Sequence, residues 1–218
     1  MIPFPRLYPI LDASFLSHPD ALFGAAEELL AAGCTVIQYR NKSGNARIML
    51  EHTRDLRKLF PSHPLAKGAK GWGSHGSVTL IMNDRADLCL AAEFDGVHVG
   101  QDDLSPESVR AIIGPDRWLG VSTHNPEQLL EADLTSADYL AIGPVFATSS
   151  KDKPDPVVGL EGVRRARALT RKPLVAIGGI TRANAVSVIE AGADSVAVIS
   201  DLLHNPRKSA EEFFRILR

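Results

Sequence analysis

Short apolar runs recur along the chain, and amphipathic stretches with polar positions on one side separate them. Four runs follow small residues, in AAGCTVIQYR, AAEFDGVHVG, TSADYLAIGP and EAGADSVAVIS, and four others are LYPIL, VTLIM, WLGVS and PLVAIGG. Apolar and polar residues do not alternate strictly within them, which is typical of strands buried on both faces. The pattern therefore predicts eight buried strands with helices between them.

Eight strand–helix units in 218 residues take about 27 residues each, which is the spacing of a compact (β/α)8 barrel, or TIM barrel. We therefore expect an α/β protein in which residues 1–218 form a single domain. The alternative is an open doubly wound sheet. That fold would need a glycine-rich dinucleotide turn after the first strand, and LYPILDASFLS has none.

Composition and charge narrow the class of protein. A net charge of -2 gives no general attraction to nucleic acid or to an anionic membrane, so we expect neither as a partner. The start, MIPFPRLYPILD, does not resemble a signal peptide, and no apolar run approaches the ~20 residues needed to span a bilayer. Cys34 and Cys89 lie in apolar segments without metal-ligand spacing, and we expect both to be reduced and buried. A cytoplasmic location is the expectation.

Polar residues follow the apolar runs, which in a barrel is where active sites form. The second to fifth runs end in Gln38–Lys42, Asn83–Arg85, His98–Asp103 and Ser122–His124. The sixth leads into the polar segment Thr148–Lys151, the seventh into Gly178–Gly179 and the eighth into Ser200. The stretch Pro61–Ser77 lies at the other end of the predicted barrel, and we read it as a solvated loop.

Two carboxylates, Asp84 and Asp103, follow neighbouring strands, whose ends are ~4.8 Å apart. Few carboxylate oxygens completed by substrate phosphates and water suit Mg²⁺. The alternative is that each Asp caps a helix. Ser105 followed by Pro106 is the better cap and first helical residue, which leaves Asp103 free for a metal.

Two anion sites are predicted around this metal position. Arg40 and Lys42 lie two residues apart and could bind a diphosphate, with Lys151 as a third cation. Gly178–Gly179 and Ser200 lie in the two loops that often hold a phosphate in such barrels. The alternative is that the glycines form only a tight turn, but their place in these loops favours a phosphate site. A metal-assisted diphosphate site beside a monophosphate site favours a transferase with diphosphate as the leaving group.

Taken in order, QYRNK, MNDRADL, DGVHVGQDDLS, LGVSTHN, GPVFATSSK, AIGGIT and AGADSVAVIS resemble the signatures of thiamine phosphate synthases, over roughly Leu7 to Leu203. The resemblance implies a transferase that joins 4-amino-2-methyl-5-hydroxymethylpyrimidine diphosphate to a (carboxy)thiazole phosphate. The resemblance also implies thiamine phosphate and diphosphate as the products and a pyrimidine cation as the intermediate. The implied partners are these small molecules, with a homo-oligomer left open.

The same resemblance implies roles for individual residues. Asp84 and Asp103 would hold Mg²⁺, and Arg40, Lys42, Ser122 and Lys151 would be catalytic. The pyrimidine diphosphate would contact Gln38, Tyr39, Arg40, Asn41, Lys42, Asn83, Ser122 and Lys151. The thiazole phosphate would contact Thr148, Ser149, Ser150, Gly179, Ile199 and Ser200. The chain departs from the family pattern at Tyr39, Asn41 and Ser150, where Leu, an acidic residue and Thr are common.

Two alternatives share these features. The related thiazole tautomerases have the same fold and use a histidine as acid and base, and His124 lies where such a histidine could act. A tautomerase reaction involves no diphosphate or metal and would not need the polar set at the strand ends. That set is Asn83, Asp84, Asp103 and Lys151, and it argues against the tautomerase. The second alternative is a non-catalytic barrel that binds thiamine precursors as a regulator. An enzyme would release diphosphate from these precursors, whereas a regulator would only bind them.

Overall fold

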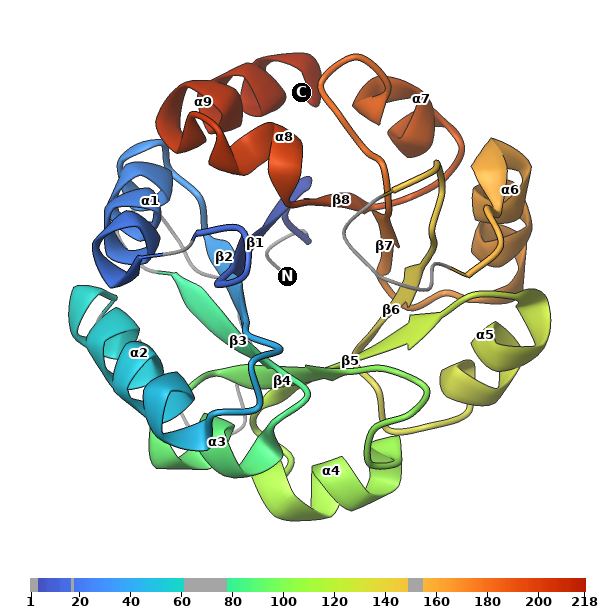
Figure 1. Cartoon of the computed structure of the whole chain (residues 1–218). Helices are drawn as coiled ribbons and strands as arrows, with labels where there is room; N and C mark the ends of the chain where they lie inside the picture. The colour runs from blue at the N-terminus through green and yellow to red at the C-terminus, as the bar shows by residue number, and fades with distance from the viewer. Residues whose placement is uncertain (1–3, 17, 61–77, 149–154) are drawn as a thin grey trace.

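Eight parallel strands form a closed barrel, with each strand paired to the next and β8 paired to β1 (Figure 1). The computed structural model describes residues 4–16, 18–60, 78–148 and 155–218. The strands are β1 (Leu7–Asp12), β2 (Val36–Arg40), β3 (Thr79–Asn83), β4 (Gly96–Val99), β5 (Trp118–Thr123), β6 (Tyr139–Ile142), β7 (Leu174–Ile177) and β8 (Ser195–Val198). The expected (β/α)8 fold is confirmed, and each predicted run is a strand.

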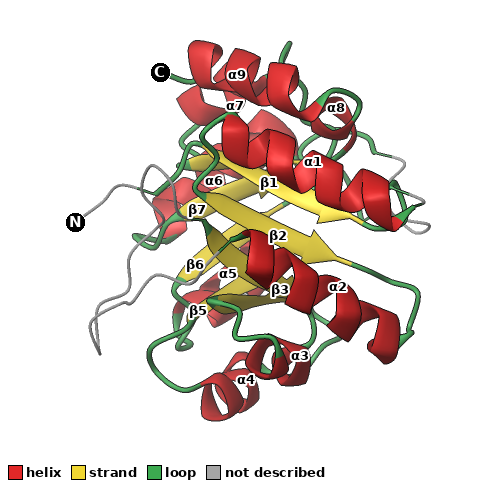
Figure 2. Cartoon of the chain, turned by 90° about the vertical axis from the view of Figure 1, so that its left-hand side faces the viewer, coloured by secondary structure: helices red, strands yellow, loops and turns green. Residues whose placement is uncertain are grey.

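Helices surround the barrel and cover the outer face of the sheet (Figure 2). They are α1 (Pro19–Ala31), α2 (Ala46–Leu59), α3 (Ala86–Ala91), α4 (Pro106–Ile113), α5 (Pro126–Asp133), α6 (Gly159–Leu169), α7 (Ala185–Glu190), α8 (Ser200–Leu203) and α9 (Pro206–Ile216). Ser105 caps α4 by accepting a hydrogen bond from the Ser108 N–H, and Pro106 is the first helical residue, as the sequence predicts. Among the described residues, no helix is long and apolar enough to cross a membrane.

The strands bury side chains on both faces. Outward-facing residues such as Leu7 and Leu11 pack against the helices in the larger core cluster. Inward-facing residues form a second cluster inside the barrel, made of Tyr8, Ile10, Val36, Ile81, Tyr139, Ala141, Val175 and Ala197. This two-sided burial is the reason for the absence of strict alternation in the sequence. Cys34 and Cys89 are free and buried, as expected, and burial raises the pKa of both thiols to about 12.

Gly120 on β5 makes room for two large polar side chains inside the barrel. A Cβ at this position would lie 2.1 Å from Cζ of Tyr139 and 2.4 Å from Nδ1 of His98. Any other residue would therefore displace the two rings. The absence of a side chain in the middle of β5 allows Tyr139 and His98 to meet inside the barrel.

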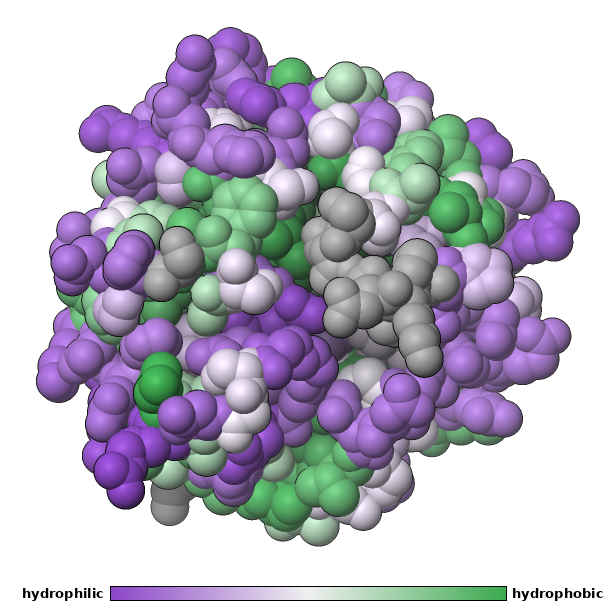
Figure 3. All heavy atoms as spheres, viewed as in Figure 1, coloured by the Kyte–Doolittle hydropathy of each residue, from purple (hydrophilic) through white to green (hydrophobic). Residues whose placement is uncertain are grey.

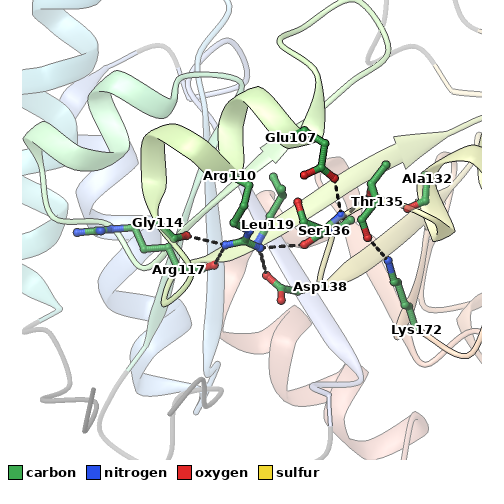
Figure 4. A network of polar contacts seen from close by, with 11 residues as sticks. Glu107, Arg110, Gly114, Arg117, Leu119, Ala132, Thr135, Ser136, Asp138 and Lys172 are labelled. Carbon is green, nitrogen blue, oxygen red and sulfur yellow. Dashed lines mark hydrogen bonds and ion pairs between the residues drawn. The ribbon is translucent and has the colours of Figure 1, made fainter. Parts of the chain in front are cut away.

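Three arginine–aspartate pairs recur at the N-terminal ends of the strands. Each Asp lies directly before one strand of the barrel. It accepts one hydrogen bond from a backbone N–H near the start of the neighbouring, earlier strand and another from an arginine of a helix. The pairs are Arg57–Asp95 with the Leu80 N–H, Arg110–Asp138 with the Leu119 N–H, and Arg167–Asp194 with the Leu174 N–H. In the second pair, Arg110 also donates to the carbonyls of Gly114, Arg117 and Ser136 (Figure 4). These pairs join helices to strands on the face opposite the C-terminal ends.

Candidate active site

A cavity of about 520 Å³ opens at the C-terminal ends of the strands. Figure 3 shows hydrophilic side chains gathered near the centre of this face. Most of the site residues expected from the sequence line the cavity, namely Gln38, Arg40, Lys42, Asn83, Asp84, Asp103, Ser122, Thr148, Gly179, Ile199 and Ser200. Ser149, Ser150 and Lys151 lie outside the described residues, as does the stretch 61–77.

Tyr39 and Asn41 do not line this cavity. Tyr39 is fully buried between the barrel and the helices, and its hydroxyl lies 3.0 Å from Nδ1 of His52. The Asn41 amide donates to the same hydroxyl at 2.9 Å. Successive residues of a strand point to opposite faces, so Gln38 and Arg40 face inward and Tyr39 faces outward. The expectation that the whole run Gln38–Lys42 contacts substrate therefore does not fit the positions of Tyr39 and Asn41.

A cluster of charges forms where β2, β3 and β4 end. The Lys42 ammonium lies 2.5 Å from Oδ2 of Asp84, and the Asp103 carboxylate accepts a hydrogen bond from the Gly100 N–H at 2.7 Å. Burial raises the pKa of Asp103, and the neighbouring Asp84 carboxylate raises it further, while the Gly100 hydrogen bond acts in the opposite direction. The two carboxylates are thus close enough to repel one another, as the spacing of their strands predicts.

The backbone holds Asp84 at this position in a conformation that is unusual for a non-glycine residue. Its φ is 63°, in the left-handed region, and its N–H donates to the carbonyl of His98 at 2.8 Å. Aspartate adopts this region more readily than most residues. The hydrogen bond to β4 brings the Asp84 carboxylate toward the residues that follow that strand.

The Asp84 and Asp103 carboxylates fit the chemistry of a Mg²⁺ site. Both offer oxygen ligands, and a divalent cation between them would relieve their mutual repulsion. Among the described residues, no group of three or more His, Cys, Asp or Glu side chains could hold a metal. A cation at this place would therefore take further oxygens from a substrate phosphate and from water.

Arg40 is held at the cavity by Asp12, a residue that sequence reasoning missed. The two are direct partners in the β1–β2 register, and their side chains form an ion pair. Asp12 is only 2% exposed and also accepts a hydrogen bond from the Ser14 N–H at 2.9 Å. The ion pair with this buried carboxylate fixes the Arg40 guanidinium in one orientation.

A line of polar side chains crosses the barrel below the cavity. The Gln38 amide donates to the Tyr8 hydroxyl at 3.2 Å, and the Tyr8 and Tyr139 hydroxyls are 2.8 Å apart. Nδ1 of His98 lies 3.1 Å from the Tyr139 hydroxyl, and Nε2 of His98 lies 2.8 Å from Oγ of Ser122. Burial lowers the pKa of His98 to about 4, so its ring is neutral at pH 7. Tyr8, His98 and Tyr139 are three further cavity residues that sequence reasoning missed.

Glycines shape the opposite side of the cavity. Gly178 and Gly179 have φ values of 100° and 63°, and a Cβ on Gly179 would lie 2.5 Å from the carbonyl oxygen of Ala147. The Phe146 N–H donates to the Gly178 carbonyl at 3.0 Å. Gly178 and Gly179 therefore form a tight turn, which was the alternative to a phosphate site in the sequence analysis. This turn packs against the segment that follows β6. Gly179 lines the cavity beside Ile199 and Ser200.

His124 also lines the cavity, at the end of β5. Its Nδ1 lies 2.6 Å from the carbonyl oxygen of Gly143, so this nitrogen carries a proton and donates it. Its Nε2 lies 3.5 Å from Oδ2 of Asp155. The Gly143 carbonyl thus holds the ring by Nδ1, and Nε2 faces the Asp155 carboxylate.

Comparisons with known proteins agree with this geometry. Residues 7–202 match the family model described as thiamine monophosphate synthase. The chain is 57% identical to a thiamine-phosphate synthase of Koribacter versatilis over 98% of its length and 96% of the relative's, and 43% identical to one of Chloroflexus aurantiacus over 89% and 83%. A solved thiamine phosphate pyrophosphorylase from Pyrococcus furiosus superposes with a TM-score of 0.81 at 34% identity, covering 97% of this chain and 95% of that one.

Proposed function

The chain belongs to the thiamine monophosphate synthase family, and we propose that its cavity binds the pyrimidine diphosphate and the thiazole phosphate on opposite sides. The protein is a transferase of thiamine biosynthesis. The diphosphate end of the pyrimidine substrate lies toward Arg40, Lys42 and Asn83, with its ring toward Gln38 and Ser122. The thiazole phosphate lies toward Thr148, Gly179, Ile199 and Ser200. What supports this division is the grouping of cations and carboxylates on one side and of glycine turns on the other.

Asp84 and Asp103 would hold Mg²⁺, which when bound supplies positive charge to the departing diphosphate. Their proximity and the raised pKa of Asp103 support this assignment. Lys42, paired with Asp84, lies where it can contact both the metal site and a phosphate oxygen. Ser149, Ser150 and Lys151 lie outside the described residues, and their substrate contacts stay a prediction from the sequence.

In the proposed reaction the bond between the pyrimidine methylene carbon and the bridging oxygen breaks first. The electron pair leaves with the diphosphate, and the aminopyrimidine ring stabilises the cation that remains. The guanidinium of Arg40 and the ammonium of Lys42 stabilise the negative charge that develops on the leaving group. The thiazole nitrogen then donates its electron pair to the methylene carbon, and a carboxylated thiazole subsequently loses CO₂. Because Asp12 fixes Arg40, this cation is oriented before substrate binds.

The single observation that carries this proposal is the meeting of Lys42, Asp84 and Asp103 at one end of the cavity. Positional isotope exchange tests it. The pyrimidine diphosphate is labelled with ¹⁸O at the bridging position and incubated with the protein and Mg²⁺, with and without a thiazole phosphate. Dissociation predicts that the label moves to non-bridging positions and that adding thiazole phosphate gives thiamine phosphate. Binding of the pyrimidine diphosphate without exchange or product would support the regulator instead.

A further inference from the structure

Five side chains form a continuous line of hydrogen bonds whose two ends face the cavity. In order, they are Gln38, Tyr8, Tyr139, His98 and Ser122, from β2, β1, β6, β4 and β5. All five side chains border the cavity, and every member except Ser122 is buried. The line therefore connects two proposed pyrimidine contacts that lie on different strands.

Each middle member has only one hydrogen to give. With the Gln38 amide nitrogen donating to Tyr8, only one direction of the bonds gives each of these hydrogens an acceptor within the line. The Gln38 amide nitrogen donates to the Tyr8 hydroxyl, so the Tyr8 hydrogen goes to Tyr139. The Tyr139 hydrogen then goes to Nδ1 of His98, which must be bare to accept it. The neutral His98 ring therefore carries its proton on Nε2 and donates it to Oγ of Ser122.

The direction of the line decides what each end can offer to a ligand. Ser122 accepts from His98, so its own hydrogen remains to donate into the cavity. Gln38 uses its amide nitrogen on Tyr8, so its carbonyl oxygen remains to accept. Reversing one bond would require every member to turn, including the Gln38 amide.

We propose that this line of hydrogen bonds selects an aminopyrimidine by making Ser122 a donor and Gln38 an acceptor, with Tyr8, Tyr139 and His98 as positioning residues. The inference rests on the proposed pyrimidine contacts of Gln38 and Ser122. The edge of a 4-aminopyrimidine has a ring nitrogen that accepts beside an amine that donates, which matches this arrangement. With the ring nitrogen toward Ser122 and the amine toward Gln38, both ends are matched. A 4-oxopyrimidine carries the opposite pattern, so its ring N–H would meet the Ser122 hydrogen and its carbonyl would meet the Gln38 carbonyl oxygen.

Two measurements on the intact protein test the inference. The first is ¹⁵N NMR of the histidine side chains in ligand-free protein, which reports which ring nitrogen carries the proton. The second is the ratio of the dissociation constants of the 4-amino and 4-oxo pyrimidine diphosphates, measured by titration calorimetry with Mg²⁺. In the wild type, His98 carries its proton on Nε2 and the amino compound binds more tightly.

Tyr139→Phe removes one hydroxyl from the line, so His98 loses its donor and Ser122 is free to turn. We expect the Nδ1-protonated form of His98 to appear and the preference for the amino compound to fall about tenfold, as for loss of one ordering hydrogen bond. Tyr8→Phe should act in the same direction and replaces Tyr139→Phe if that variant does not fold. Tyr39→Phe is the matched control, because it also removes a buried phenol hydroxyl beside a histidine. It should leave the His98 proton on Nε2.

A wild-type His98 protonated on Nδ1 would overturn the inference while leaving the proposed function intact. The same holds if Tyr139→Phe and Tyr8→Phe change neither the proton position nor the ratio of dissociation constants. If the wild type binds neither pyrimidine diphosphate, the proposed function fails and the selection fails with it. A merely structural role for the tyrosines would lower the unfolding temperature of the variants without changing the ratio.

Discussion

Nζ of Lys42 lies 2.5 Å from Oδ2 of Asp84, so the cation that follows β2 and the carboxylate that follows β3 form a pair at the cavity. The pair is unusual because both partners are assigned to the same bound diphosphate, one directly and one through a metal. Because Lys42 is about half exposed, the pair contributes little to the stability of the fold. In the proposed reaction the pair concentrates charge beside the leaving diphosphate.

Replacing Lys42 should therefore lower activity without lowering stability. Lys42→Gln removes one charge that stabilises the leaving diphosphate, and we expect kcat/KM for the pyrimidine diphosphate to fall by ~10². Lys58→Gln is the matched control, because Lys58 forms an exposed pair with Asp55 on the outer face of α2. Steady-state kinetics should show no change for Lys58→Gln. Equal kcat/KM values for both variants would remove Lys42 from the reaction.

For the arginine–aspartate pairs at the other end of the barrel, we expect a substitution to lower stability without lowering activity. Arg110→Met leaves the Asp138 carboxylate partly buried without its cation and frees three backbone carbonyls (Figure 4). We expect the free energy of unfolding in urea to fall by about 3–5 kcal/mol, with kcat/KM of the folded protein unchanged. Arg165→Met, which breaks an exposed pair with Glu161, should cost less than about 1 kcal/mol. Similar losses for the two variants would contradict a stabilising role for Arg110.

The neutral His98 ring predicts how stability depends on pH. Its pKa is lowered by burial from 6.5 to about 4, so between these values the unfolded chain binds a proton that the folded protein does not. Stability is therefore complete above pH 6.5 and falls as the pH is lowered toward 4, by about 1.4 kcal/mol per pH unit for one proton.

Urea unfolding of the wild type and of His98→Gln at several pH values between 7 and 4.5 measures this contribution. His52, whose pKa burial also lowers, adds to the slope in both proteins, so the difference between them isolates His98. The slope of His98→Gln should be smaller by about one proton. Parallel slopes would mean that His98 is already charged in the folded protein.

Replacing His124 distinguishes a synthase from a tautomerase. Its ring contacts the Gly143 carbonyl and lies near Asp155, so it is held at the cavity without a place in the line from Gln38 to Ser122. His124→Gln should retain synthase activity within about tenfold, a change of ~1.4 kcal/mol in the barrier. A variant without activity, together with a wild type that isomerises thiazole without pyrimidine, would favour the tautomerase.

The barrel and the charged end of the cavity could be predicted from the sequence, because both depend on local patterns. Strand ends meet at one face of a barrel, so Asp84 and Asp103 were expected to be neighbours as soon as β3 and β4 were recognised. The outward position of Tyr39 follows from the two-residue period of a strand. Val36, Gln38 and Arg40 share the inner face, and this parity could have been read from VIQYR.

The contacts inside the barrel could not be predicted in this way. Tyr8 and Tyr139 are 131 residues apart and meet only because β1 and β6 both direct these side chains into the closed barrel. No local pattern indicates that a histidine inside a buried strand bonds to both Tyr139 and Ser122. Asp12 was missed for a similar reason, since its pairing with Arg40 depends on the β1–β2 register.

The most direct measurement of whether the charged end of this cavity carries out the transfer is thiamine phosphate formation by the wild type and by Asp84→Asn/Asp103→Asn. Both substrates are mixed with each protein, with Mg²⁺ or with excess EDTA, and circular dichroism verifies that the variant is folded. We expect the wild type to form thiamine phosphate and diphosphate in equal amounts only with Mg²⁺, and the double variant to lose at least ~10² in rate. A folded double variant that works at the wild-type rate, or a wild type that is fully active in EDTA, would contradict this assignment.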